Sequence, residues 1–393
     1  MRRHSVTRRS TVRRDPEKVR RKTLLALGLV ALAAVLGACA PNATQDSLDP
    51  AGPFARKSHD LFVPVFWVAV GIFVVVEGAL VWFAIRYRHR KGREGIPPQV
   101  HGNTRLEVAW TILPAVILAG VAVPTVATIF DLAREPDEGV MRVDVLGHQW
   151  WWEFSYLEQG FTTANELHIP TGEPVYLRLC GVGMGGSPDA KAAVTTECQP
   201  GGDEGPRPEA IGDAVIHSFW VPQLAGTIDV VPGQTNNLWI EADEPGRYSG
   251  QCKEFCGLSH AYMKFVVVAH EPAEYETWLQ GQLEPASPPE GEAATAGAEL
   301  FVQRCTACHT VDGVVGGDGE PVPVAQQSNG APNLTHFMSR ECFRGCTMPI
   351  TEENLRRWLR NPQAVEAGSW MILEPPLTEQ EIDNLVAYLQ TLR

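Results

Sequence analysis

Two long apolar runs lie in the first third of the chain. The first, 61–85, contains a single charged residue, Glu77, and the second, 108–130, contains Pro114 and Pro124 but no charge. About 20 apolar residues in a helix can cross a bilayer, and proline is tolerated where helices pack together. A carboxylate inside a span normally faces protein, so we expect Glu77 to contact a partner subunit. The pattern predicts a membrane hairpin with helices at 58–86 and 107–131 and a loop at 87–106.

The polar segments around these runs predict the orientation of the hairpin. Its loop contains the basic stretch RYRHRKGRE, which the positive-inside rule places in the cytoplasm. Residues 1–22 are rich in Arg and Lys and precede a short apolar run at 24–36, an arrangement typical of a secretory signal. We therefore predict a signal peptide at 1–38 and a polar linker at 39–57, with the segments beyond the hairpin on the extracytoplasmic face of the cell membrane.

The predicted signal ends in the sequence LGAC, in which the cysteine is Cys39. This sequence resembles the lipobox of bacterial lipoproteins, whose cysteine becomes the acylated N-terminus. A lipid on Cys39 would add a second tether to a chain that already spans the membrane. The alternative is a plain signal or an uncleaved anchor.

Residues 140–280 have a different texture, with short alternating and β-branched runs broken by Pro and Gly. Several short strands at this spacing predict an antiparallel sandwich or barrel. The stretch GHQWWWEF holds three tryptophans in a row. With a strand period of two, Trp150 and Trp152 share one face and Trp151 takes the other. At least one of them should therefore meet solvent or a neighbouring surface.

A hinge rich in Pro, Ala and Glu at 281–294 leads to a segment with helical patterning at 295–393. This segment contains Cys305-Thr-Ala-Cys308-His309, the motif of covalent c-type haem attachment. Two thioethers fix the porphyrin edge, and the histidine takes the proximal iron position. The motif is short enough to arise by chance, but a secretory signal and a helix before it favour haem c.

Three methionines are candidates for the sixth iron ligand, namely Met338, Met348 and Met371. The stretch WLRNPQAVEAGSWM, followed by PPLTEQEIDNLVAYLQTL, resembles the axial-methionine segment and C-terminal helix of cytochromes c. We therefore choose Met371, although Ile372 follows it where proline is usual. Met348 lies in Thr-Met-Pro and remains the alternative, and we expect Met338 to be a packing residue.

The stretch GQCKEFCGLSHAYM concentrates possible metal ligands. It contains Cys252, Cys256, His260 and Met263, and His217 lies upstream in DAVIHSFWVP. Sulfur with imidazole selects copper, zinc or iron–sulfur, and the thioether favours copper. Two thiolates that bridge two copper ions, each capped by one histidine, would use all these ligands. The alternative is a disulfide between the two cysteines in an oxidising compartment.

Charge narrows the range of partners. The net charge is -13, and the first 38 residues hold ten Arg or Lys and two Asp or Glu, so their removal leaves 23 basic and 44 acidic residues, a balance of -21. This acidity argues against a nucleic-acid partner.

Four further cysteines form two local pairs, Cys180 with Cys198 and Cys342 with Cys346. Disulfides are plausible for both pairs outside the cytoplasm, although the second loop is short and strain disfavours it. The Gly- and Ala-rich stretch from residue 180 to 212 is expected to be a surface excursion pinned by the first pair.

These motifs together resemble cytochrome c oxidase subunit 2 with its binuclear CuA centre. GHQWWWEF is similar to the GHQWYW of that family, and LEVAWTILPAVIL looks like its second span. With the haem motif, the chain resembles the caa type, which has a fused C-terminal cytochrome c domain. The resemblance implies a multidomain membrane protein: a two-helix transmembrane hairpin, an all-β cupredoxin-like CuA sandwich at 140–280 and an all-α class I cytochrome c domain at 295–393.

The resemblance also implies roles for individual residues. The backbone carbonyl of Glu254 would bind one copper while its carboxylate points to a magnesium site shared with subunit 1, and Met263 would be the weak ligand of the other copper. Trp150 would lie on the electron-entry surface, with Trp151 where the family commonly has Tyr. Glu107 would match the carboxylate at the entrance of the K-channel, although a charge that caps the helix is an equal alternative.

The function implied by the resemblance is electron entry into a respiratory haem–copper oxidase. Electrons would pass from an external donor, such as a cytochrome c or a bc complex, through haem c and CuA to haem a in subunit 1, where oxygen is reduced and protons are pumped. Subunit 3 is a further expected partner. Two alternatives are a membrane-anchored copper carrier or assembly protein, which leaves the haem motif unexplained, and the copper subunit of a nitrous or nitric oxide reductase.

Overall fold

The computed structural model describes residues 43–88, 101–135, 139–181, 215–232, 234–316, 319–324 and 330–393, with short stretches elsewhere before residue 101. The chain divides into a unit at 1–44 and a unit at 45–393, and every element below belongs to the second. The predicted cleavage site and most of the excursion after residue 181 lie outside the described residues.

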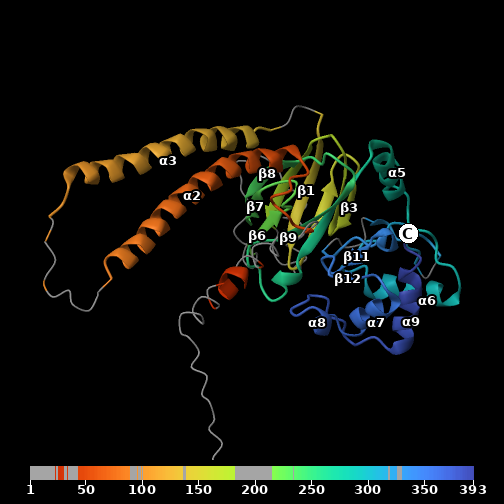
Figure 1. Cartoon of the computed structure of the whole chain (residues 1–393). Coiled ribbons are helices and arrows are strands. Elements are labelled where there is room, and N and C mark those ends of the chain that lie inside the picture. The colour runs from red at the N-terminus through yellow and green to blue at the C-terminus, as the bar shows by residue number, and fades with distance from the viewer. Residues whose placement is uncertain are drawn as a thin grey trace, which may run out of the picture. The chain divides into compact units, whose positions relative to one another are not determined.

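Two long apolar helices, α2 (Pro53–Arg86) and α3 (Thr104–Leu132), are long enough to cross a membrane (Figure 1). Both begin before the helices predicted from the apolar runs. Pro53 occupies the first turn of α2, where its missing N–H costs nothing, and Phe54 is buried against Trp239 of the strand domain. Arg56 forms a two-pronged ion pair with Asp243 at 2.6 and 2.9 Å. The first turn of α2 is therefore part of the extramembrane fold, which hydropathy alone does not report.

Ten strands in the described part of the chain form two five-stranded sheets (Figure 1). The first has the order β3-β2-β1-β5-β8 and the second β4-β10-β9-β6-β7. The strands are β1 (Met141–His148), β2 (Trp151–Tyr156), β3 (Phe161–Ala164), β4 (Glu166–Pro170), β5 (Val175–Gly181), β6 (His217–Trp220), β7 (Thr227–Val230), β8 (Thr235–Ile240), β9 (Gly246–Cys252) and β10 (Lys264–His270).

The predicted sandwich is confirmed, but it is not purely antiparallel. β1 runs parallel to β5, and β4 runs parallel to β10. Only one residue, Asn165, separates β3 from β4, and there the chain leaves the first sheet for the second. Strand patterning shows which face is buried but not the direction of the neighbouring strand, so the sequence did not reveal the two parallel pairs.

The core of the sandwich is aromatic directly behind the predicted copper loop. Trp152, Phe219 and Phe265 are fully buried, and their ring centroids lie 4.5 to 5.6 Å apart. Gly250 on β9 makes room for this cluster, since a Cβ there would lie 2.2 Å from the Phe265 ring. The cluster fixes β6, β9 and β10 together, and these are the strands that carry the loop. A helix, α5 (Pro272–Gln282), follows β10.

The C-terminal domain contains α6 (Glu292–Arg304), α7 (Glu352–Arg360), α8 (Pro362–Val365) and α9 (Glu379–Leu389). α6 and α9 cross closely at Gly297, where a Cβ would lie 2.0 Å from the backbone oxygen of Asn384. Phe301 packs against Tyr388 beside this crossing. The domain departs from the all-α expectation by one short antiparallel pair, β11 (Cys342–Phe343) and β12 (Met348–Pro349).

Candidate metal centre and haem pocket

The predicted copper loop connects β9 to β10. A hydrogen bond of 2.9 Å from the N–H of Cys252 to the carbonyl of Met263 closes the loop at its base. β6 pairs with β9 so that Phe219 lies opposite Cys252, and this register brings His217 beside the loop. Strand pairing therefore gathers the ligands from two separate stretches of sequence.

The donor atoms converge within this loop. The two sulfurs of Cys252 and Cys256 lie 3.8 Å apart, which excludes a disulfide bond of about 2.05 Å. His217 Nδ1 lies 3.9 Å from the first sulfur, and His260 Nδ1 lies 3.5 Å from the second. Met263 Sδ lies 3.7 Å from the sulfur of Cys256. Each thiol thus has its own imidazole, as the two-metal hypothesis requires.

The two thiols lie within hydrogen-bond distance and shift each other's pKa. The hydrogen bond between them lowers the pKa of Cys252, and the neighbouring Cys252 sulfur raises the pKa of Cys256, which keeps that thiol protonated. The carbonyl of Glu254 also faces the pair, 3.2 Å from Cys252 Sγ, while its side chain is exposed. Metal ions bind thiolates, so a copper pair would displace this proton and neutralise buried negative charge.

The three tryptophans take different environments. Trp152 is fully buried in the core, and Trp151 is partly exposed and stacks on His148 with ring centroids 4.0 Å apart. Trp150 lies in the turn before β2, so it does not share a strand face with Trp152 as the alternation predicted. Its Nε1 donates to the backbone carbonyl of Cys256 at 3.0 Å. Trp150 is therefore hydrogen-bonded to a residue of the copper loop.

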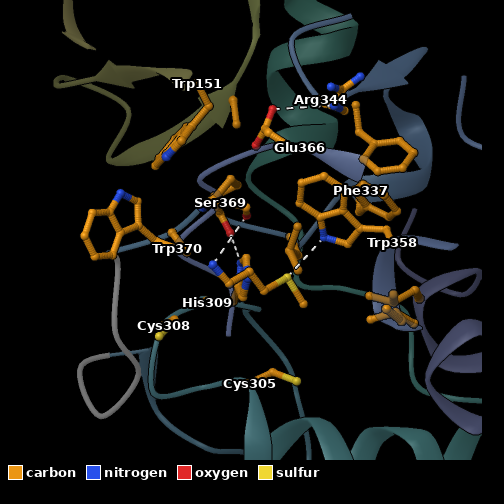
Figure 2. Close-up of a pocket in the computed structure, with 18 of the residues that line it drawn as sticks. Trp151, Cys305, Cys308, His309, Phe337, Arg344, Trp358, Glu366, Ser369 and Trp370 are labelled. Atoms are coloured by element: carbon orange, nitrogen blue, oxygen red, sulfur yellow. Dashed lines mark hydrogen bonds and ion pairs between the residues drawn. The ribbon is translucent and has the colours of Figure 1, made fainter. Parts of the chain in front are cut away.

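A cavity of about 280 Å³ contains the haem-attachment motif (Figure 2). Cys305, Cys308 and His309 line one side, and the apolar walls include Phe337 and Trp358. The strand domain supplies part of the lining as well, namely His148, Gln149, Trp150 and Trp151.

Two buried groups fit a haem in this cavity. His309 Nδ1 makes a hydrogen bond of 2.8 Å with the carbonyl of Pro332, which orients the ring and leaves Nε2 for iron, and burial lowers its pKa so that the imidazole is neutral. Arg340 lines the same cavity and donates to the carbonyl of Asn333. Burial lowers the pKa of Arg340 to about 10, although the charge of the Glu166 carboxylate opposes the shift. A haem propionate would compensate this charge.

The three candidate methionines are placed in different surroundings. Met371 lines the cavity, and Trp358 Nε1 donates to its sulfur at 3.1 Å (Figure 2). Met348 is buried on β12 and is not part of the described lining. Met338 is partly buried and packs against the helical core. This placement favours Met371 as the axial ligand.

Glu107 lies in the first turn of α3. Its carboxylate accepts a hydrogen bond of 3.2 Å from the N–H of Asn103, whose own side chain accepts from the backbone N–H of Arg105. This is a reciprocal cap, and it accounts for the carboxylate as a helix-capping group.

The remaining cysteines are only partly described. Cys180 and Cys346 are each disulfide-bonded. Cys198 and Cys39 lie outside the described residues, as does the side chain of Cys342.

Sequence reasoning missed four residues that hold the two sites. Gln149 donates a side-chain hydrogen bond to the carbonyl of Cys256, and Trp358 donates to Met371. Pro332 orients His309, and Arg340 is buried in the haem cavity. A proline-containing APNL stretch after the haem motif was a usable signal for the third. The other three depend on side-chain contacts made in the folded domains, which sequence spacing does not reveal.

Three family models match this chain. The transmembrane domain of cytochrome c oxidase subunit II matches residues 41–128, its periplasmic domain matches residues 209–270, and cytochrome c matches residues 294–393. With the sandwich and the helical domain described above, these matches define the class: a membrane-anchored protein that combines a β-domain of the subunit II type with a cytochrome c domain.

Relatives extend these matches over almost the whole chain. Cytochrome c oxidase subunit 2 of Alkalihalophilus pseudofirmus is 35% identical over 93% of this chain and 96% of its own length. The same subunit of Bacillus sp. strain PS3 is 32% identical over 88% of this chain and 91% of its own length. The periplasmic domain of subunit II from Bradyrhizobium japonicum, a solved structure, is 22% identical over 38% of this chain and 96% of its own, with a TM-score of 0.28.

The chain belongs to the cytochrome c oxidase subunit II family, in the form that carries a C-terminal cytochrome c domain. It is accordingly a subunit of an oxidoreductase complex, anchored in a membrane by its two apolar helices.

Proposed function

We propose that this chain is the electron-entry subunit of a respiratory haem–copper oxidase. It takes electrons from an external donor, such as a cytochrome c or a bc complex, and passes them to subunit 1, where oxygen is reduced to water with proton pumping. The observation that carries the proposal is the pair of unbonded thiols 3.8 Å apart, each with an imidazole Nδ1 within 4 Å. A disulfide or a purely structural loop has no need for this arrangement.

Six groups would hold a binuclear copper centre. The thiolates of Cys252 and Cys256 would bridge the ions, His217 and His260 would cap them, and the thioether of Met263 and the carbonyl of Glu254 would complete the set. The bound centre would supply one-electron chemistry with little structural change, because its donors are already in place before the metal binds. The exposed Glu254 carboxylate is then available to a magnesium site shared with subunit 1.

Four residues would hold haem c. Cys305 and Cys308 form the thioethers, His309 is the proximal ligand and Met371 is the distal one. Two strong protein ligands leave the iron no open position, so the haem would carry electrons rather than bind oxygen. Trp358 keeps the sulfur of Met371 oriented through its hydrogen bond.

Trp150 is the proposed point of electron entry to the copper centre. Its ring lines the haem cavity, and its Nε1 is hydrogen-bonded to the carbonyl of Cys256. One rigid side chain therefore touches the surroundings of both centres. Trp151 lies beside it in the lining.

The membrane arrangement completes the proposal. The basic loop after α2 lies in the cytoplasm, so the copper and cytochrome domains lie on the extracytoplasmic face, and Cys39 carries a lipid. Subunits 1 and 3 pack against the hairpin. Glu107 contributes its carboxylate to the entrance of the K-channel while it caps α3.

The test uses the whole oxidase complex, purified with haem and copper loaded. We expect a c-type haem band, two copper ions in the β-domain and a near-infrared mixed-valence signal. Replacement of Cys256 by Ser should abolish the mixed-valence signal and leave the haem band. A single copper ion in the wild-type domain, or none with copper supplied, contradicts the proposal.

A further inference from the structure

Two loops of the cytochrome domain contact the copper loop so closely that each has a glycine where no side chain would fit. We name them the seat loops, residues 344–346 and residues 366–369. Each contains a glycine with positive φ, Gly345 at 56° and Gly368 at 84°. A substitution at either glycine therefore meets both backbone strain and a steric obstacle.

The obstacle at Gly345 is backbone. A Cβ there would lie 2.0 Å from the carbonyl oxygen of Tyr262 and 2.8 Å from the nitrogen of Lys264. These two residues flank Met263, one of the proposed copper ligands. Backbone atoms cannot rotate away as a flexible side chain does, so any side chain at Gly345 must lift its loop or displace the copper loop.

The obstacle at Gly368 is the ring of Trp150. A Cβ there would lie 2.5 Å from ring atom Cη2 and 3.2 Å from Cδ1 of Leu258. The Trp150 ring is itself fixed by its hydrogen bond to Cys256. Next to this contact, the buried Ser259 hydroxyl donates to the carbonyl of Ala367 at 2.9 Å. The chain segment that ends in Met371 is thus held directly against the copper loop.

An ion pair joins the two seat loops. Arg344 Nε lies 3.6 Å from Oε1 of Glu366, and both side chains are about nine-tenths buried (Figure 2). The guanidinium also lies 4.0 Å from the centre of the Tyr262 ring in the copper loop. A buried cation over an aromatic ring stabilises a contact more than an exposed one does. Arg344 therefore links both seat loops to the copper domain.

We propose that Gly345 and Gly368 are positioning residues for electron transfer between the two centres. Arg344 holds the two seat loops together and against the copper loop. Their missing side chains allow the axial-methionine segment to rest on Trp150 and on the copper loop. The inference rests on the proposed function. The step that they position moves one electron from ferrous haem to the oxidised copper pair, so the haem iron becomes ferric, and no bond or proton changes place.

The decisive comparison is Gly368→Ala against Gly319→Ala. Gly319 lies in the same domain with the same φ of 84°, and a Cβ there meets nothing within 4 Å. Both variants carry the same left-handed strain, but only the first has a side chain between the seat and Trp150. In the complete oxidase complex, an added photoreductant donates one electron to haem c in a light flash, and reoxidation of the haem is followed together with the near-infrared copper band.

We expect haem-to-copper transfer to be slower in Gly368→Ala by roughly tenfold or more, because the ring and the loop must separate by about 1 Å. Gly319→Ala should transfer at the wild-type rate. Haem and copper spectra should match the wild type in both variants, which separates a positioning effect from damage to either centre.

Two further variants cover the case in which Gly368→Ala disturbs Met371. Gly345→Ala acts on the other seat loop, which carries no proposed haem ligand, and should also slow the transfer. Arg344→Gln removes the cation from the Tyr262 ring and should slow it by about two- to tenfold. Wild-type rates in Gly368→Ala and Gly345→Ala would overturn the inference and leave the proposed function intact. No haem-to-copper transfer in the wild type would overturn the proposed function itself.

Discussion

The copper loop and the haem pocket reach their function in opposite ways. In the copper loop, strand pairing brings two sulfurs and two imidazoles within 4 Å of their neighbours before any metal is bound. In the cytochrome domain, the attachment residues surround a cavity of about 280 Å³ between short helices and loops. The copper ligands thus lie in a loop over a filled core, whereas the haem ligands line a cavity inside their domain.

This difference shows which region depends on its cofactor for folding. The sandwich buries its own aromatic cluster behind the copper loop, so the metal adds to a core that already exists. The helical domain buries Phe301, Leu385 and Tyr388 at the crossing of α6 and α9, but Phe301 and Leu385 also line the cavity. We therefore expect copper to be dispensable for folding and haem to be essential.

The strongest test of this comparison is to prevent haem attachment with Cys305→Ser and Cys308→Ser together. A residual apolar cavity costs about 24 cal/mol per Å³, so a cavity of about 280 Å³ costs about 7 kcal/mol, as much as the whole stability of many domains. The cytochrome domain should lose cooperative unfolding in circular dichroism, while the copper band and the unfolding of the sandwich persist. Removal of copper by a chelator should leave both transitions cooperative, and a cooperative haem-free cytochrome domain would contradict the comparison.

Substitutions of Met348 and Met371 separate a packing role from an iron-ligand role in the cytochrome domain. Met348→Ala removes a buried side chain and should lower the free energy of unfolding by about 2 to 5 kcal/mol without changing the haem spectrum. Met371→Ala should lower the haem potential and convert the iron to high spin or to a substitute ligand. If Met348→Ala changed the haem spectrum and Met371→Ala did not, Met348 would be the axial ligand.

Buried carboxylates predict opposite pH dependence in the two regions. Burial raises the pKa of Glu366 to about 7, although Arg344 opposes the shift. The folded domain keeps this proton where the unfolded chain, with a pKa of about 4.5, has lost it. The stability of the haem-loaded cytochrome domain should therefore fall by up to about 3 kcal/mol as the pH rises from about 4.5 to 7.

In the copper domain, burial favours the protonated form of Glu166, but hydrogen bonding and charge at His168 outweigh it and lower the pKa. The stability that Glu166 contributes is fully present above the usual carboxyl pKa. It is lost as the pH falls through the pKa that Glu166 has in the folded protein. The free energy of unfolding of each domain, measured across this pH range, shows whether stability rises or falls with pH. Glu366→Gln is the control that should remove the pH dependence of the cytochrome domain. Equal slopes in Glu366→Gln and the wild type would refute the assignment.

The smallest effect is expected for Trp150→Phe, which keeps an aromatic side chain, although a smaller one, and deletes the hydrogen bond to Cys256. Gln149 still donates to that carbonyl, so the loss of stability should be only about 1 kcal/mol. Haem-to-copper transfer should nevertheless slow while both spectra are retained. A rate equal to that of the wild type would reassign Trp150 to packing alone.

The order of the domains and much of the chemistry could be predicted from the sequence. The apolar runs predicted two membrane helices, and alternating residues predicted a sandwich, because burial repeats with the period of the element. The helix starts differ from the prediction by three to five residues. α2 begins early because Phe54 packs in the strand domain, and α3 begins early because Asn103 caps its first turn. The parallel pairs of β1 with β5 and β4 with β10 were not predicted.

By itself, the sequence determined which groups can carry chemistry: Cys252, Cys256, His260 and Met263 lie in one loop, and Cys305, Cys308 and His309 in one turn. Short spacing alone restricts such groups to a common neighbourhood. Only the tertiary structure decided which methionine enters the haem cavity, what Trp150 touches and why Gly345 and Gly368 bear no side chain. The contacts of Trp150, Gly345 and Gly368 join atoms from more than 80 residues away, and Met371 lies about 60 residues beyond the haem-attachment motif, so contact is set by packing and not by local geometry.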